Sequence, residues 1–330
     1  MSAVSRFWHP VLRARALGRE PVQVMLDGER YALWRGAEGR IGALVDRCPH
    51  RFAPLSGGHV RSDGRLVCPY HGWRFDQAGR GESPSQPELR RCAAQAMQAV
   101  ERDGVIWLAG QEVPMERLPR LGAPGYEAGG VMFQRFAAPL HVVLDNFSED
   151  EHTPWVHTRL GWREEDVGTI GFEAENFPDR TEVRYEARQR PSALGGFFGI
   201  KKGDHFHNRW TTLFDPVRSI YEIHWTDASG AVTRPGRLLA PIFMVPLDAG
   251  STMMVVFMFV RLEGALRRLG SLARRAALML IQREIRDDAR FVPALAETPM
   301  TMQGMRLGRF DKPLIHNRRL LARIYRGVEE

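Results

Sequence analysis

Two pairs of cysteine and histidine constrain this chain more than any other feature of its sequence. The first pair is Cys48-Pro-His50 and the second is Cys68-Pro-Tyr-His71, with seventeen residues between His50 and Cys68. Each pair fits within one tight turn, so each turn presents a thiolate and an imidazole together. Two thiolates on one iron and two imidazoles on the other form the ligand set of one class of [2Fe–2S] cluster. The spacing therefore predicts a small domain built around such a cluster.

Zinc is the alternative for these four side chains, because two cysteines and two histidines also form a common zinc site. Zinc motifs usually keep the cysteines together and the histidines together, whereas each pair here is mixed. The pattern therefore favours the cluster. The third cysteine, Cys92, has no place in the motif, and we expect a half-buried apolar thiol there.

The bulk composition excludes several classes of protein. The chain has 330 residues, 44% of them hydrophobic, which allows one large domain or two ordinary ones. Three cysteines do not make a disulfide framework, so we expect a reducing, cytoplasmic compartment. No uncharged apolar run reaches about 18 residues, so no membrane span is expected. The net charge is +7, but no basic repeat interleaved with aromatic residues occurs, so nucleic acid is not an expected partner.

Turn signals divide the chain into two parts with different patterns. The first 110 residues hold short strand-like segments separated by turn pairs such as Asp27-Gly28 and Asp103-Gly104, which is typical of a small sandwich or barrel. Residues 111–130 are rich in Pro and Gly, and they predict a boundary between domains 1–112 and 113–330. Strands are expected at 22–26, 31–34, 41–46, 65–68, 105–108, 131–136, 140–144, 181–187, 207–214, 220–226, 238–245 and 253–261. The longest helix is expected over 268–291, which is rich in Ala, Leu and Arg.

A second group of possible ligands begins near Asp145, where we expect a helical stretch to open. Residues 145–157 have the sequence DNFSEDEHTPWVH. Two histidines with a carboxylate on one face of the ion are the ligands of many mononuclear non-haem iron sites. On a regular helix His152 and His157 would point about 140° apart. Pro154 interrupts the helix, and this break allows both imidazoles to reach one metal.

Together these segments resemble one family, the Rieske non-haem iron oxygenases. Residues 40–80 resemble a Rieske domain of the oxygenase and ferredoxin branch, because the extra loop cysteines of the respiratory branch are absent. Residues 145–157 are similar to the family's iron motif, with an acidic residue, Asn, a bridging acidic residue and then His-x4-His. The resemblance implies that His152 and His157 bind iron and that Glu149, where most members have Asp, is the bridging residue. It implies a catalytic role for Asn146 beside them.

The resemblance also implies a third iron ligand, a carboxylate on a late helix. Asp288 is the candidate and Asp287 is the alternative. The implied cofactors are a [2Fe–2S] cluster, held by the two Cys–His pairs, and a mononuclear Fe(II), with O2 as cosubstrate. NAD(P)H would act only indirectly, through a reductase, because no Gly-rich dinucleotide motif follows a strand.

The fold implied by the resemblance is α+β, with an N-terminal all-β Rieske domain and a catalytic domain of antiparallel sheet plus helices, of the helix-grip or START-like kind. The implied function is the terminal oxygenase of a multicomponent monooxygenase, which hydroxylates or oxidatively demethylates a small organic substrate. The chain's size is similar to that of members built from one type of subunit, such as vanillate demethylase and phthalate dioxygenase. The implied partners are a flavin or iron–sulfur reductase, with or without a ferredoxin, and two further copies of the chain in a head-to-tail homotrimer.

Three other functions remain open from the sequence. The first is a dioxygenase that forms a ring cis-dihydrodiol. The second, of a different class, is an electron carrier that uses only the cluster, and the third is a zinc-bearing binding module. Aromatic residues offer candidate pocket walls in the second half of the chain, with ordinary core packing as the alternative: Phe197, Phe198, Phe206, Trp210, Tyr221 and Trp225.

Overall fold

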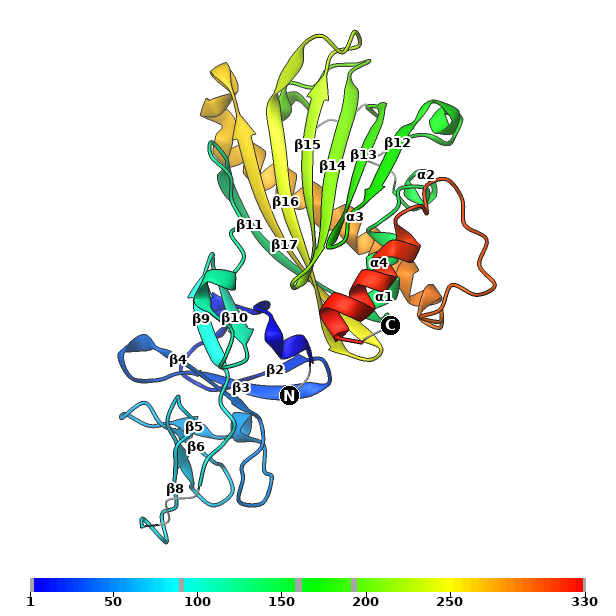
Figure 1. Cartoon of the computed structure of the whole chain (residues 1–330). Helices are drawn as coiled ribbons and strands as arrows, with labels where there is room; N and C mark the ends of the chain where they lie inside the picture. Colours follow the sequence, from blue (N-terminus) through cyan, green and yellow to red (C-terminus); the bar gives the residue numbers. More distant parts are fainter. Residues whose placement is uncertain (1–2, 89–91, 158–161, 191–194, 329–330) are drawn as a thin grey trace. The chain divides into compact units, whose positions relative to one another are not determined.

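The computed structural model describes residues 3–88, 92–157, 162–190 and 195–328. The chain forms two compact units (Figure 1). Unit 1 consists of Met1–Pro119 with Val245–Ala249, and unit 2 consists of Arg120–Met244 with Gly250–Glu330. Among the described residues, no helix has the length and apolar character needed to cross a membrane.

Unit 1 is built from short antiparallel strands. One sheet contains β1 (His9–Arg13), β10 (Val105–Ala109) and β9 (Gln98–Arg102), in that order. A second contains β2 (Val22–Leu26), β3 (Glu29–Arg35) and β4 (Ile41–Val45), and a third contains β5 (His59–Val60), β6 (Leu66–Val67), β7 (Arg74–Phe75) and β8 (Gly81–Glu82). The strands predicted in this part of the chain are confirmed, although β6 is shorter than expected.

The predicted turn pairs close two of these hairpins. Asp27 and Gly28 have φ values of 51° and 81°, and Asp103 and Gly104 have values of 55° and 75°. Positive φ at both central residues matches the right-handed twist of the flanking strands, which is why Asp-Gly is favoured at such turns. The sequence signal therefore has a direct conformational cause.

Unit 2 contains a seven-stranded antiparallel sheet in the order β11-β17-β16-β15-β14-β13-β12 (Figure 1). Its strands are β11 (Glu127–Phe136), β12 (Gly171–Asn176), β13 (Arg180–Arg188), β14 (His205–Phe214), β15 (Val217–Thr226), β16 (Thr233–Asp248) and β17 (Ser251–Leu262). The helices are α1 (Leu140–Asn146), α2 (Thr153–Val156), α3 (Gly270–Phe291) and α4 (Leu314–Leu320). The all-β first unit and the sheet-plus-helix second unit confirm the α+β prediction.

Helix α3 crosses the sheet and packs on β11 and β17 (Figure 1). The predicted helix is confirmed, although it begins at Gly270 after a 3-10 segment over Gly264–Leu269. Ala273, Ala277 and Ile285 are buried at four-residue multiples, so they form one stripe against the sheet. Two carboxylates, Glu284 and Asp288, are also buried near the end of this helix.

The prediction of a strand over residues 140–144 is wrong. These residues form the start of α1, which begins at Leu140 rather than near Asp145. Leu140, Val142, Val143 and Leu144 are all buried. A short run that is apolar on every side has no periodicity by which a buried helix differs from a buried strand.

Candidate metal centres

The two cysteine turns of unit 1 have the same backbone hydrogen bonds despite their different spacing. The N–H of Cys48 donates to Ala53 O at 2.9 Å, and that of Cys68 donates to Trp73 O at 2.7 Å. In each turn the fourth residue after the cysteine, Phe52 or Gly72, donates back to the cysteine carbonyl. Both of these residues have positive φ, at 61° and 69°. The two turns therefore have the same backbone hydrogen-bonding pattern, and each ends at a residue in the left-handed backbone conformation.

The turns separate the sulfur ligands from the imidazole ligands. Cys48 and Cys68 are buried in the core, within hydrogen-bonding reach of each other. His50 and His71 are exposed, with ring centroids 4.6 Å apart. This arrangement matches a two-iron cluster in which thiolates hold the inner iron and imidazoles hold the outer one.

The surroundings of these ligands suit a bound metal. Burial raises the pKa of the Cys48 thiol to about 11, so a metal ion is needed to hold this side chain as a thiolate. The ring of His50 stacks on Trp73, with centroids 4.8 Å apart and planes 3° from parallel. That contact fixes the orientation of the imidazole.

Aromatic and basic side chains cover the surface around the two imidazoles. Phe52 is 68% exposed and Tyr70 is 58% exposed. The guanidinium of Arg47 lies 5.2 Å from the centre of the Phe52 ring, and that of Arg51 lies 5.6 Å from the centre of the Tyr70 ring. Large exposed aromatic side chains beside cationic ones are typical of a surface that contacts another protein.

In unit 2, His152, His157 and Asp288 each offer one ligand atom, and these three atoms lie within 4.8 Å of one another. The Nε2 atom of His157 is 3.3 Å from Asp288 Oδ1, and that of His152 is 3.6 Å from the same oxygen. His152 precedes α2, and His157 ends it in an extended conformation, with φ −103° and ψ 132°. Because α2 is so short, the two imidazoles do not follow helical geometry and face the same point.

A carboxylate lies beside the outer nitrogen of each imidazole. Glu149 Oε1 lies 2.5 Å from Nδ1 of His152, and this hydrogen bond keeps the proton on Nδ1 and leaves Nε2 free for a metal. Glu284 Oε2 lies 3.1 Å from Nδ1 of His157, without the geometry of a hydrogen bond. The sequence analysis missed Glu284. Its position four residues before Asp288 on the predicted helix places both carboxylates on one face, a signal that was available.

Asn146 and Asp287 lie in different surroundings. The Nδ2 of Asn146, near the end of α1, donates to Asp288 Oδ1 at 3.3 Å and so orients that carboxylate. Asp287 instead pairs with the exposed side chain of Arg290 at 3.2 Å. Of the two adjacent aspartates, Asp288 is the one that meets the histidines.

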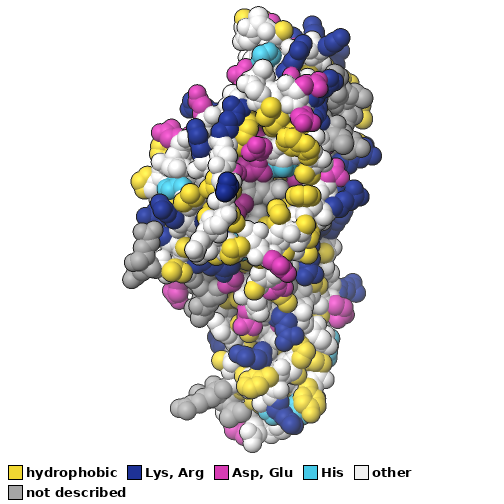
Figure 2. All heavy atoms as spheres, turned by 90° about the vertical axis from the view of Figure 1, so that its right-hand side faces the viewer, with side chains coloured by type: hydrophobic (Ala, Val, Ile, Leu, Met, Phe, Trp, Pro, Cys, Tyr) yellow, Lys and Arg dark blue, Asp and Glu magenta, His cyan; other side chains and the backbone are white. Residues whose placement is uncertain are grey.

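Negative charge dominates this site. The cavity at the triad is lined by the carboxyl groups of Glu149, Asp150, Glu284 and Asp288. Burial alone lowers the pKa of His157, but the nearby carboxylates of Asp288 and Glu284 outweigh burial and raise it to about 10. Figure 2 shows acidic side chains gathered among hydrophobic ones in the upper part of one face. Two imidazoles within a cage of carboxylates fit a divalent cation in charge and in ligand type.

A cavity of about 130 Å³ opens beside the triad. A smaller one of about 30 Å³ shares Phe206, Ile223 and Ile281 with it. Among the aromatic residues singled out in the sequence, Phe206 and Tyr221 line the first cavity, and Phe198 and Trp225 line the second. Trp210 is buried behind Tyr221, with ring centroids 5.4 Å apart.

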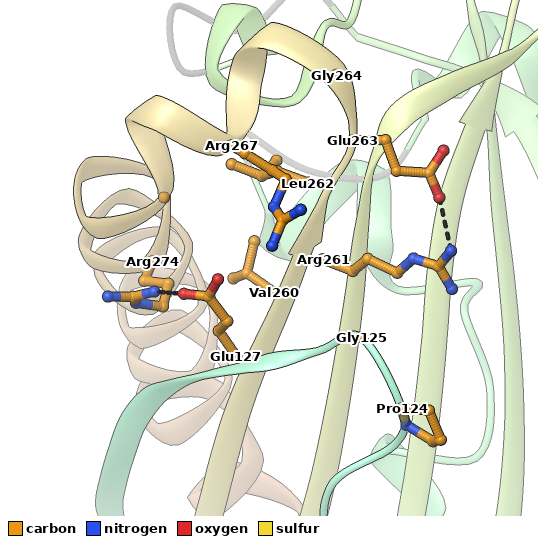
Figure 3. Close-up of a pocket in the computed structure, with 11 residues that line it drawn as sticks. Pro124, Gly125, Glu127, Val260, Arg261, Leu262, Glu263, Gly264, Arg267 and Arg274 are labelled. Carbon is orange, nitrogen blue, oxygen red and sulfur yellow. Dashed lines mark hydrogen bonds and ion pairs between the residues drawn. The ribbon is translucent and has the colours of Figure 1, made fainter.

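A larger depression of about 530 Å³ lies between the start of α3, β17 and the segment before β11 (Figure 3). Four of its charged side chains pair within the depression, Arg274 with Glu127 and Arg261 with Glu263, and Arg267 also lines it. None of its lining residues is a histidine, a cysteine or an aromatic residue. The smaller cavity at the triad is therefore the candidate reaction site.

Several known proteins are similar to this chain in sequence or in fold. The family model of the Rieske [2Fe–2S] domain matches residues 7–96. The chain is 35% identical over 159 residues to the vanillate O-demethylase oxygenase subunit of Pseudomonas sp., covering 46% of this chain and 48% of that protein. It is 29% identical over 271 residues to the 3-chlorobenzoate-3,4-dioxygenase oxygenase subunit of Comamonas testosteroni, covering 76% of this chain and 58% of that protein.

The fold is similar to that of dicamba monooxygenase in its crystal structure with bound dicamba. The TM-score is 0.79 at 19% sequence identity, and the match covers 98% of each chain. In sequence, this chain spans between 25% and 58% of the length of the curated relatives it matches.

Proposed function

Because residues 7–96 match the Rieske [2Fe–2S] domain and the fold is similar to that of dicamba monooxygenase, we propose that this chain is the terminal oxygenase of a multicomponent monooxygenase. It would hydroxylate or oxidatively demethylate a small organic substrate. The observation that carries this proposal is the meeting of His152, His157 and Asp288 at a cavity with apolar walls. A cluster domain alone would suffice for an electron carrier, which has no need of such a triad.

The proposed ligands follow from the donor sets. Cys48, His50, Cys68 and His71 would hold the [2Fe–2S] cluster of domain 1–112. His152, His157 and Asp288 would hold a mononuclear Fe(II) in domain 113–330. Three protein ligands on one face of this ion would leave positions open on its other face. Binding of O2 at those positions is the chemistry that the iron would supply when bound.

The neighbouring residues would position these ligands. Glu149 and Glu284 would keep the Nδ1 protons of His152 and His157 in place, so that both Nε2 atoms face the metal. Asn146 would orient Asp288 through its amide. The apolar wall formed by Phe206, Ile223 and other residues of the sheet would exclude water from the substrate.

Electrons would come from a separate flavin or iron–sulfur reductase, with or without a ferredoxin, in a cytoplasmic setting that the few cysteines favour. We propose a head-to-tail homotrimer in which Glu149 joins His152 to His71 of a neighbouring copy. The exposure of His71, together with that of Phe52 and Tyr70, supports a protein partner at the cluster.

A dioxygenase that adds both oxygen atoms to a ring is the second candidate. The relative matched over 76% of this chain is named as a 3,4-dioxygenase, and this observation favours it. Product analysis would separate the two, because a monooxygenase transfers a single oxygen atom to the product.

The test of the proposed function is to purify the protein anaerobically, count iron and sulfide, and record visible and EPR spectra. About three irons for every two sulfides, with the rhombic signal of the reduced cluster, is the expected result. Equal iron and sulfide that persists after Fe(II) is added would indicate an electron carrier. A colourless protein that contains zinc would contradict the proposal.

A further inference from the structure

We propose that the substrate of the triad cavity is a non-anionic molecule about the size of one aromatic ring, whose O–H or N–H group is bound by Tyr185 and Asn208. This inference rests on the proposed function of the same cavity, and it adds the class of substrate. It assigns a binding role to two residues that the sequence analysis did not select.

Tyr185 and Asn208 form a polar pair on an otherwise apolar face of the sheet. They lie directly opposite each other on β13 and β14. The next position along this row, on β15, is Ile223, and the flanking position on β14 is Phe206. All four side chains line the cavity at the triad. The pair is therefore a local polar feature within a hydrophobic wall.

Neither polar group has a protein partner. Tyr185 is 4% exposed and Asn208 is 8% exposed. The hydroxyl of Tyr185 and Oδ1 of Asn208 have no hydrogen-bond partner among the described residues. Tyr221, which lines the same cavity, differs, because its hydroxyl donates to Phe147 O at 2.7 Å. Asp150, His157 and Glu284 also have unpaired polar atoms, but these lie at the triad, whereas Tyr185 and Asn208 lie on the sheet wall. Buried polar groups are nearly always hydrogen-bonded, so the two unpaired groups on this wall indicate a ligand that pairs with them.

The pair offers both kinds of hydrogen bond to such a ligand. Burial raises the pKa of Tyr185, so the phenol keeps its proton and can donate. The amide of Asn208 has an accepting oxygen and a donating nitrogen. A hydroxyl, amide or amine group on the substrate fits these partners because it can donate to Asn208 and, where it has a lone pair, accept from Tyr185.

The charge of the cavity argues against a carboxylate on the substrate. Glu149, Asp150, Glu284 and Asp288 line it, and no Lys or Arg is among its described lining residues. A divalent iron would offset only part of this negative charge. Because like charges repel strongly at short range in a site of low dielectric constant, an anionic group would be disfavoured there.

The size of the cavity limits the rest of the molecule. Its volume is about 130 Å³, with about 30 Å³ more in the cavity that shares Phe206, Ile223 and Ile281. An apolar cavity of about 150 Å³ is large enough to bind benzene. A single ring with one or two small substituents therefore fits best.

Three probes that share a 3-methoxyphenyl ring and differ in the charge and hydrogen bonding of the side group test the inference. They are 3-methoxybenzyl alcohol, 3-methoxybenzylamine and 3-methoxybenzoate, each titrated anaerobically into the iron-loaded protein by calorimetry. We expect the alcohol and the amine to bind at least about tenfold more tightly than the benzoate, which is a difference of about 1.4 kcal/mol. Benzoate binding of equal or greater affinity would overturn the inference, and so would the absence of binding by all three.

Variants then test the polar pair. Tyr185→Phe and Asn208→Leu should each weaken binding of the alcohol about tenfold, with unchanged iron content and circular dichroism. Tyr126→Phe is the matched control, because it removes the same hydroxyl group from a tyrosine that does not line the cavity. If neither variant changes the affinity, the pair has no binding role.

The two proposals fail in different ways. If the proposed substrate class is wrong, the iron-to-sulfide ratio and the cluster spectrum will still be those of the proposed oxygenase. If the proposed oxygenase function is wrong, those metal measurements will differ before any probe is added.

Discussion

Glu284 and His157 form a direct contact, with Glu284 Oε2 3.1 Å from His157 Nδ1. Glu284 lies one turn before Asp288 on α3, so this helix provides both a proposed ligand and the partner of another ligand. A small displacement of α3 would therefore change two of the three proposed metal contacts together.

Replacement of Glu284 should weaken the mononuclear site. We expect Glu284→Ala to lower the affinity for Fe(II) about 10- to 100-fold, because His157 would lose the partner that fixes its tautomer. Glu284→Gln retains an acceptor and should recover part of the affinity. Anaerobic titration of Fe(II) into cluster-loaded protein gives the measurement. Glu263→Ala, on the surface, is the control, and equal affinity in Glu284→Ala and in this control would contradict the assignment.

Adjacent aspartates provide a matched test of the third ligand. Asp288→Ala should retain the colour of the cluster and lose the mononuclear iron, which lowers the ratio of iron to sulfide to about one. Asp287→Ala should retain the full ratio, because Asp287 pairs with Arg290 outside the triad. Iron and sulfide analysis of the two purified variants checks this. The opposite pattern would assign the ligand to Asp287.

Glu149 should affect electron transfer more than metal content. Its carboxylate contacts Nδ1 of His152 and is the proposed link to His71 of a neighbouring copy. We expect Glu149→Ala, loaded with excess Fe(II) to offset the lost contact with His152, to retain both metal centres and lose most of its turnover. Single-turnover oxidation of the pre-reduced cluster, with substrate and O2, is the measurement. A normal rate of cluster oxidation in the variant would exclude the bridging role.

The pair of buried Arg318 and half-buried Asp145 should contribute to stability. Arg318 Nε lies 3.0 Å from Asp145 Oδ2, and Arg318 Nη1 also donates to the carbonyls of Pro299 and Met300. We expect Arg318→Met to lower the free energy of unfolding by about 1–3 kcal/mol, because it removes the donor of a half-buried carboxylate and of two carbonyls. Urea denaturation followed by circular dichroism gives the value. Arg290→Met, at an exposed ion pair, should cost about 0.5 kcal/mol or less.

Local patterns succeeded where a single turn or a single periodicity decides the structure. The Asp-Gly turns have the positive φ values that their residues favour, and the long Ala- and Leu-rich helix lies where it was predicted. The predicted strand over residues 140–144 failed because its side chains are buried on all sides, which removes the periodic signal. Tyr185 and Asn208 were missed because each is an ordinary residue until its neighbours are known, whereas the four-residue spacing of Glu284 and Asp288 was a signal that could have been used.

By itself, the sequence determined the two Cys–His turns, because each turn is local and its ligands lie within four residues of each other. It also placed His152 and His157 on either side of Pro154, which lies in the first turn of α2. Only the tertiary structure decided which carboxylates meet these histidines, because 130 residues lie between His157 and Asp288. It also decided that Tyr185 and Asn208 share one cavity, because the register between two strands is set by the packing of the whole sheet.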